Sequence, residues 1–160
     1  MSADRHKKTS PDANVIARNK RARFEYEVLE QYEAGLSLLG SEVKSLRNGD
    51  VSINEAFVRP RDSDLWVVGM NVKLYAQANV RNHDPLRARR LLLHRREIKK
   101  IIGKVAERGM TLVPLRLYWK RGMAKMTVAL VRGRRKYDKR QVIKKRESDR
   151  DIQRAMRRRR

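Results

Sequence analysis

The sequence predicts a mainly β fold, a small Greek-key barrel that ends in a basic tail. The chain has 160 residues, enough for one domain with flexible ends. Five or six of its segments have the alternation or the apolar composition of strands, and about two have the period of a helix. So few helices cannot supply alternating βαβ units, which leaves a small barrel as the simplest arrangement.

The first segments predict an arm, a strand and a helix in that order. Residues 1–18 are polar and aperiodic, so we expect a mobile arm there and a barrel over residues 19–132. The strand is expected in FEYEVLEQYEAGLSL, residues 24–38, where apolar and acidic residues alternate. SEVKSLRNG, residues 41–49, predicts a short helix that Ser41 caps and that Asn48 and Gly49 end.

The middle of the chain predicts two more strands and a second helix. VSINEAFV, residues 51–58, alternates, and LWVVGMNVKL, residues 65–74, is apolar almost throughout, like a strand covered on both faces. Residues 81–94 fit either a loop with a short strand or a turn. The next segment has a clear helical period, because Ile98, Ile101, Ile102 and Val105 fall at i, i+3, i+4 and i+7 before Gly109.

A hairpin completes the predicted barrel. TLVPLRLYWKRGMAKMTVALV, residues 111–131, contains two β-rich runs around Gly122. Alternation gives the first strand one apolar face and one polar face, and the polar face carries Arg116, Tyr118 and Lys120. Pro114 suggests that this strand begins at a sheet edge, since proline donates no ladder hydrogen bond.

Residues 133–160 form the basic tail. From residue 132 onward the chain holds 15 Lys or Arg against 4 Asp or Glu, and few apolar residues. Such a segment cannot bury enough surface to offset about 1 to 2 kcal/mol of backbone entropy per residue, so we expect it to be disordered when free. Its Lys, Arg, Gln, Glu and Met residues favour a helix once phosphates neutralise the cations.

The charge of the chain indicates a polyanionic partner. The net charge is +23, and it is concentrated in residues 81–160, which hold 29 Lys or Arg against 7 Asp or Glu. Residues 1–80 are nearly balanced, with 12 against 11. Repulsion on this scale is relieved when a polyanion binds, and nucleic acid is the favoured candidate.

A membrane partner is not expected. The apolar run at residues 65–72 is far shorter than the roughly 20 residues of a membrane helix, and the N-terminus lacks the apolar stretch of a signal peptide. The tail has no broad apolar face for a lipid surface. The chain has no cysteine, which excludes disulfides and thiolate metal sites and is compatible with a reducing cytoplasm.

No catalytic constellation stands out in the sequence. His6, His83 and His94 lack metal-ligand spacing, and neither a phosphate-binding glycine loop nor a nucleophile motif is present. His83 is expected in a turn. Glu30 and Glu33 could hold Mg²⁺ in a nuclease, although acids on such a strand more often face water. We therefore expect no enzyme, no metal and no cofactor.

Several features are typical of nucleic-acid binding. Four basic clusters can contact phosphates, or else form a solvated face: residues 19–23, 87–90, 94–96 and 119–122. Tyr118, His94 and Tyr137 could stack on bases, although Tyr118 is equally suited to packing at an edge. Glu33 could accept a hydrogen bond from a base amino group, but taken alone it is more often an ordinary surface acid.

Five strings carry a resemblance to a known family. They are NKRARFEYEV, YEAGLSLLGSEVKSLRNGDVSINEAFV, HDPLRARRLLLH, LVPLRLYWKRGMAKMTVALVRGRRKYDKR and IKKRESDRD. Together they closely resemble the small protein B family, the SsrA-binding proteins of bacteria, from about Asn19 to the C-terminus. The pieces EAG…GSEVKSLR and YDKR…IKKR are the most specific.

The resemblance implies an OB-fold barrel and a role in trans-translation. The expected function is to bind the tRNA-like domain of transfer-messenger RNA (SsrA) and to deliver it to stalled ribosomes. The barrel would replace the missing anticodon arm, and the tail would fold as a helix while it probes the decoding centre of 16S rRNA and the empty mRNA channel. Elongation factor Tu is an implied partner in the delivery complex. A cytoplasmic monomer is expected.

The resemblance also indicates the binding residues. Together with the basic clusters, it predicts an RNA-binding surface of Lys20, Arg21, Arg23, Glu33, Lys44, Arg47, Arg90, Leu92, His94 and Lys120. The predicted ribosome-binding residues of the tail are Tyr137, Asp138, Lys139, Arg140, Lys144, Lys145 and Arg146. Tyr137 occupies the position of an aromatic residue that can stack on a decoding-centre base. The family often has an apolar pair near the tail end, and here Ile152 and Met156 are both candidates.

Two other classes of protein remain open at this point. A structural ribosomal protein with a basic extension would have the same charge. A nuclease would use paired acids and a divalent ion.

Overall fold

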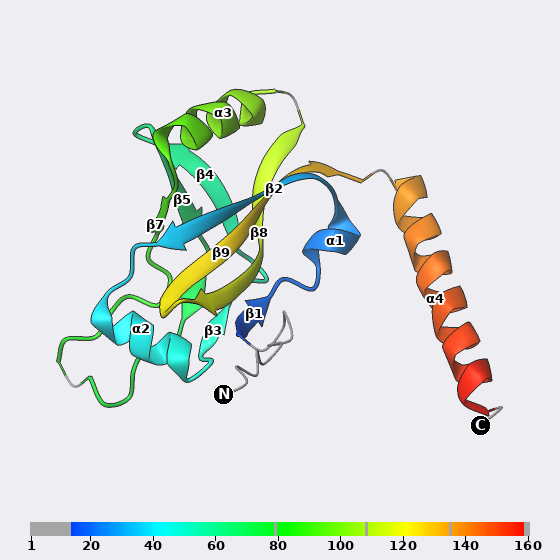
Figure 1. Ribbon diagram of the computed structural model, residues 1–160, viewed down its shortest axis with the longest axis horizontal. Coiled ribbons are helices and arrows are strands. Elements are labelled where there is room, and N and C mark those ends of the chain that lie inside the picture. Colours follow the sequence, from blue (N-terminus) through cyan, green and yellow to red (C-terminus); the bar gives the residue numbers. More distant parts are fainter. Residues whose placement is uncertain (1–13, 79, 108, 135, 159–160) are drawn as a thin grey trace, which may run out of the picture.

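The mainly β fold is confirmed. The computed structural model describes residues 14–78, 80–107, 109–134 and 136–158, with the backbone alone at residues 136–138 and 157–158. Within these ranges six antiparallel strands pair in a closed ring, in the order β8 (Met110–Lys120), β9 (Met123–Gly133), β2 (Tyr26–Leu36), β7 (Arg89–Leu92), β5 (Asp64–Val68) and β4 (Phe57–Arg61) (Figure 1). Because β4 also pairs with β8, the ring has no free edge.

Strand β1 (Val15–Arg18) joins the barrel from a segment that we expected to be mobile. It pairs with β8, where Val15 lies opposite Tyr118, and the amide of Trp119 donates to the carbonyl of Asn14 at 2.9 Å. The prediction of a mobile arm over residues 1–18 is therefore wrong for residues 15–18, and residues 1–13 lie outside the described residues. Three apolar residues are too few to give a period, yet they are enough to pair along β8.

The hairpin β8–β9 is confirmed, but Pro114 does not mark a strand edge. Arg121 and Gly122 form its turn with φ values of 50° and 73°. Pro114 is buried within β8, beside a register shift in the pairing with β9. A bulge accommodates proline in a central strand, because one residue there is left out of the ladder.

The other predicted strands are shorter than expected. Residues 24 and 25 of the first one belong to the short helix α1 (Ala22–Glu25), and β2 follows it. Of residues 51–58, only β3 (Val51–Ser52) and the start of β4 are strands. Residues 65–74 divide at Gly69, which has φ of 75° and lies so close to the carbonyl of Glu55 that an added Cβ would be 2.7 Å from it. Beyond that turn β6 (Asn71–Val72) pairs with β3.

Helix α3 (Arg95–Val105) has the predicted period and lies across one end of the barrel (Figure 1). Ile98 and Ile101 are buried among the apolar side chains of the barrel interior, and Ile102 and Val105 pack at the margin of the same core. The helix therefore closes the barrel and holds His94, the residue before its first turn, at the end of β7.

Helix α2 (Gly40–Arg47) is confirmed, but Ser41 does not cap it. The carboxylate of Glu42 instead accepts the amide hydrogen of Leu39 at 2.8 Å. Ser41 lies within the helix, and its hydroxyl is 2.9 Å from Nδ1 of the buried His83. Gly49 ends the helix as expected, with φ of 76°.

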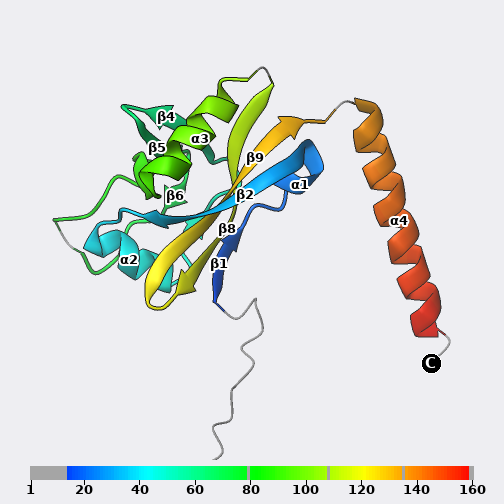
Figure 2. The ribbon, with the colours of Figure 1, turned by 45° about the horizontal axis from the view of Figure 1, so that its top comes forward.

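The tail has the helical conformation that is expected of it on the ribosome. Residues Lys136–Arg158 form helix α4, which runs apart from the barrel on the side of α1 (Figure 2). The helix-favouring composition of this segment agrees with this conformation. Its disorder when free stays a prediction. Within the described residues, no helix is long and apolar enough to cross a membrane.

Candidate nucleic-acid interface

The polar outer face of the sheet β2–β9–β8 is the centre of the candidate site. Cross-strand partners share one face of a sheet, so the pairing of Glu33 with Thr127, and of Thr127 with Arg116, places these three side chains in one row. The next row brings Lys125 beside Tyr118. The outer face therefore carries cations, an aromatic ring and one carboxylate, the groups that contact phosphates and bases.

Glu33 is held in a fixed position on this face. Its carboxylate accepts a hydrogen bond from the Tyr118 hydroxyl at 2.5 Å and from the Lys120 ammonium at 2.9 and 3.0 Å. The guanidinium of Arg116 lies over the ring of Tyr118, 5.2 Å from its centroid. Tyr118 is therefore neither a free stacking platform nor simple edge packing, since it orients Glu33.

These contacts keep Glu33 ionised. The hydrogen bonds from Tyr118 and then Lys120 hold the pKa of Glu33 below its ordinary value. Partial burial, together with the bond to Glu33, raises the pKa of the Tyr118 phenol, so it remains a donor. A carboxylate has more acceptor positions than these two partners use, and the remainder can accept from a base amino group.

A groove lies beside Glu33, across the ends of β2 and β7. It has a volume of about 540 Å³, and the predicted residues Glu33, Arg90, Leu92 and His94 all line it, together with Lys125. We call these five residues the Glu33 groove. Leu92 reaches across β2 because Gly35 opposes it, where an added Cβ would lie 3.3 Å from the Cβ of Leu92. Leu92 is 46 % exposed, so it offers apolar surface to a base or ribose.

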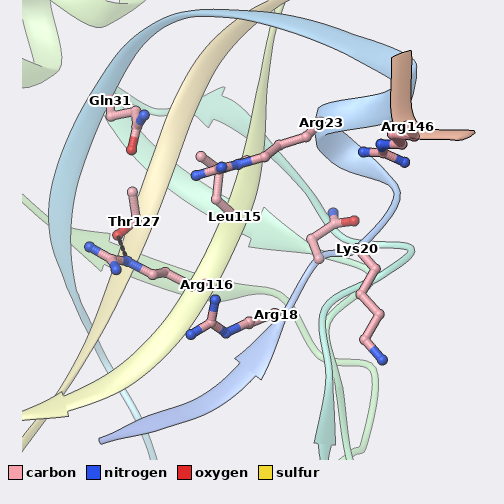
Figure 3. Close-up of a pocket in the computed structure, with 9 residues that line it drawn as sticks. Arg18, Lys20, Arg23, Gln31, Leu115, Arg116, Thr127 and Arg146 are labelled. Carbon is pink, nitrogen blue, oxygen red and sulfur yellow. Dashed lines mark hydrogen bonds between the residues drawn. The ribbon is translucent and has the colours of Figure 1, made fainter. Parts of the chain in front are cut away.

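A second hollow lies at the other end of the same face (Figure 3). It has a volume of about 310 Å³, and five of its lining residues are cations. We call these five residues the arginine pocket: Arg18, Lys20, Arg23, Arg116 and Arg146. Thr127 also lines it and accepts a hydrogen bond from Nε of Arg116 at 3.1 Å. Because Thr127 lies opposite Glu33, the pocket and the groove belong to one surface.

The three cations of residues 19–23 reach two different parts of the surface. The side chain of Asn19 accepts from the amides of Arg21 and Ala22, at 3.2 and 3.0 Å, which fixes the turn that starts α1. This turn directs Lys20 and Arg23 to the arginine pocket, whereas Arg21 forms an ion pair with Glu55 at 2.9 Å. The structure therefore brings two of these three predicted cations together and separates the third.

The basic cluster at residues 87–90 is mostly structural. Arg87 and Arg89 both donate to the buried carboxylate of Glu42, with Nε distances of 2.8 Å in each case. Arg89 is fully buried and also donates to the carbonyl of Met70 at 2.8 Å. Only Arg90 of this cluster faces the Glu33 groove, next to Asp64 at 3.6 Å. The interpretation of the whole cluster as a phosphate-binding site was wrong.

Lys44 and Arg47 lie on α2, outside both the Glu33 groove and the arginine pocket. The Lys44 ammonium lies 5.2 Å from the centre of the Tyr75 ring. Arg47 is exposed. Their role in binding RNA stays a prediction.

The predicted tail residues lie along α4. Arg140, Lys144 and Lys145 are exposed, Lys139 is half-buried, and Arg146 lines the arginine pocket. Ile152 and Met156 are 50 % and 67 % exposed and, four residues apart, share one face of the helix. The side chains of Tyr137 and Asp138 lie outside the described residues.

Glu30 and Glu33 do not form an acidic pair. Glu30 accepts from Lys104 of α3 and from the hydroxyl of Tyr32, whereas Glu33 binds Tyr118 and Lys120. No group of three or more potential metal ligands occurs in the described ranges. The paired-acid site that a nuclease would need is thus not formed by these two residues.

Sequence reasoning missed Arg116, Lys125 and Thr127 as site residues. Strand alternation predicts that Arg116 shares a polar face with Tyr118 and Lys120, but it does not show that this face belongs to the site. Lys125 and Thr127 lie on β9, and only the register of β9 with β2 and β8 shows that they share this face.

Comparisons with known proteins agree over most of the chain. A family model described as SmpB protein matches residues 16–158. An SsrA-binding protein of Rhodopirellula baltica is 50 % identical over 153 residues, which are 95 % of this chain and 87 % of the relative. One from Geobacillus thermodenitrificans is 49 % identical over 148 residues, 92 % of this chain and 96 % of the relative. A solved structure described as "tmRNA-SmpB: a journey to the center of the bacterial ribosome" has 43 % identity and a TM-score of 0.63, covering 79 % of this chain and 92 % of that chain.

Proposed function

Because the chain belongs to the SmpB protein family, we propose that it binds the tRNA-like domain of transfer-messenger RNA and delivers that RNA to stalled ribosomes. This function is trans-translation, in which the barrel takes the place of the anticodon arm. The observation that carries the proposal is the extent of the family match, since residues 16–158 include both the barrel and α4.

The Glu33 groove supplies the means to recognise RNA. Glu33 is fixed by Tyr118 and Lys120 and can accept from a base, while Leu92 offers apolar surface beside it. Arg90 and Lys125 lie in the same groove and can contact phosphates. Asp64 and Glu97 also line the groove. A fixed carboxylate beside cations and an apolar side chain is a pattern that can select an RNA shape, whereas charge alone cannot.

Helix α4 supplies the part that senses the ribosome. Its 23 residues span roughly 35 Å as a helix, a length suited to a channel that otherwise holds mRNA. Most of its cations are exposed and can follow rRNA phosphates. In the proposal the tail enters only where no mRNA occupies the channel, with Tyr137 at the decoding centre.

The proposal also covers a further partner, the oligomeric state and the location of the protein. We include elongation factor Tu as a partner in the delivery complex, a monomeric state and a cytoplasmic location, because a ribosome-bound partner of transfer-messenger RNA acts where the ribosome is. The protein acts as a binding protein without catalysis, since the acids considered for a nuclease are engaged separately by Lys104 and Lys120.

A peptide-tagging assay on ribosomes stalled at truncated messages tests this function. The full chain is expected to support tagging, and deletion of residues 136–160 is expected to abolish it while selective binding to transfer-messenger RNA persists. Failure of the full chain to support tagging would contradict the rescue function and favour a structural ribosomal protein. Cleavage of the RNA at saturating Mg²⁺ would instead favour a nuclease.

A further inference from the structure

The arginine pocket gathers five cations, and none of the described residues that line it is acidic. Elsewhere on the barrel, cations such as Arg21, Arg90 and Lys120 each have an acidic partner. In the described part of the chain, the ammonium of Lys20 and the guanidinium of Arg23 make no hydrogen bond or ion pair. Like charges held together in this way repel one another until an anion occupies the space between them.

The pocket is built by rigid parts of the fold. The amides capped by Asn19 fix the turn that carries Lys20, and Arg116 is held by its hydrogen bond to Thr127 and by the Tyr118 ring. Arg116 also lies at the register shift of β8, where a bulge redirects a side chain from the regular alternation. Arg116 and the backbone that carries Lys20 are therefore positioned before any ligand arrives, which reduces the entropy lost on binding.

Arg146 gives the pocket a second component from the tail. Its guanidinium lies 5.8 Å from the centre of the Phe24 ring of α1, and it lines the pocket from α4 (Figure 3). Elsewhere the beginning of α4 faces β2 across an open hollow of about 480 Å³, lined by Glu27, Arg134, Gln141, Val142 and Lys145. A hollow with so little apolar surface holds the helix weakly, so an anion at Arg146 can decide where α4 lies.

We propose that the arginine pocket binds a backbone phosphate of the RNA, and that Arg146 then holds α4 against α1 through this phosphate. The identity of the RNA rests on the proposed function, but the anion site itself does not. Guanidinium groups match phosphate oxygens by paired N–H donors, and three arginines from separate elements surround this space besides Arg18 and Lys20. Occupation of the pocket thus couples RNA binding on the barrel to the direction of the tail.

A backbone phosphate fits better than free phosphate because the pocket and the Glu33 groove lie on the same face of the sheet. Arg116 and Thr127 border the pocket, and Thr127 is the register partner of Glu33. A chain of nucleotides can therefore place a phosphate in the pocket while a neighbouring part of the same RNA reaches Glu33.

The first test measures the salt dependence of binding to the labelled tRNA-like domain. Each phosphate contact contributes about 0.9 to the slope of log K against log salt concentration. Because the cations of the pocket share one phosphate, we expect R23Q, R116Q and R146Q each to lower the slope by up to roughly that amount. The matched controls R59Q and R150Q remove the same charge from exposed positions outside the pocket and should change the slope by clearly less. Equal slopes for pocket and control variants, with selective binding intact, would overturn the proposal without affecting the proposed function.

The second test follows the tail directly. The chain has no cysteine, so spin labels at S52C and S148C, both exposed, report the distance between the barrel and α4. Addition of the RNA should narrow the distance distribution, and R146Q should prevent this narrowing while R150Q should not. Narrowing by inorganic phosphate alone would overturn the assignment to RNA backbone. Narrowing by RNA in R146Q as in the parent would overturn the role of Arg146.

Discussion

The buried ion pairs of Glu42 support one prediction about how the candidate site is assembled. Glu42 is fully buried and joins α2 to β7 and to the segment before it by accepting from Leu39, Arg87 and Arg89. The E42Q substitution keeps the shape of the side chain but removes its charge. Arg89 then remains buried without an anion, although it still donates to the carbonyls of Met70 and Pro85.

The expected loss follows from this burial. Removal of one partner of a buried ion pair costs about 3–5 kcal/mol, against a total stability of about 5–15 kcal/mol for a domain. The matched control is E27Q, because Glu27 pairs with Arg132 at 3.1 Å but both side chains are more than half exposed. An exposed pair contributes about 0–1 kcal/mol.

Urea denaturation followed by circular dichroism measures both variants. We expect E42Q to lower the midpoint strongly with an unchanged m value, and E27Q to leave it nearly unchanged. Burial opposes ionisation of Glu42, but the hydrogen bond from Arg87 leads the contacts that outweigh it and hold its pKa below the ordinary value of 4.5. The ionised Glu42 thus stabilises the fold fully above about that pH, and this stabilisation is lost as the pH falls through the folded-state pKa. A loss below about 1 kcal/mol at neutral pH would refute the reasoning.

Three further predictions concern the groove, a glycine and a phenol. E33Q should weaken selective RNA binding although it removes a negative charge from a basic protein; tighter binding in a competition assay would mean that Glu33 only repels RNA. G69A should lower the thermal midpoint, since its Cβ would lie 2.7 Å from the Glu55 carbonyl at a φ of 75°, and an unchanged midpoint would contradict this close contact. Burial and then the bond to Glu30 raise the pKa of Tyr32 to about 12, so Tyr32 should ionise late in an ultraviolet titration, as should Tyr118, whose pKa is also raised. The neutral form of Tyr32 stabilises the fold fully below pH 10, and this contribution is lost between about pH 10 and 12; a Y32F profile with no smaller late step than that of the parent would contradict the assignment.

The sequence was most informative where a pattern is local. The period of Ile98, Ile101, Ile102 and Val105 located α3, and Gly122 located the turn of the hairpin. The strand pairing of residues 15–18 was missed because its partners lie about a hundred residues away along the chain. Pro114 misled for a different reason, since a bulge in the pairing of two strands is not visible in the sequence even when they form one hairpin.

The candidate site was partly predictable for the same reason. The resemblance provided Glu33, Leu92 and His94, which the structure brings into one groove. Basic clusters could not reveal which cations are engaged within the protein, so Arg87 and Arg89 were grouped with Arg90 although they bind Glu42. Pairing of a buried carboxylate with cations 45 and 47 residues away depends on the tertiary fold, which composition does not report.

Selective binding of transfer-messenger RNA is the central claim. The most direct measurement is the affinity of the full-length protein for the labelled tRNA-like domain, with excess unrelated tRNA present and across a salt series. We expect tight binding to persist under competition, because Glu33 and Leu92 contribute contacts that charge alone does not provide. Equal displacement by any tRNA would contradict the claim, since a net charge of +23 would then explain the binding.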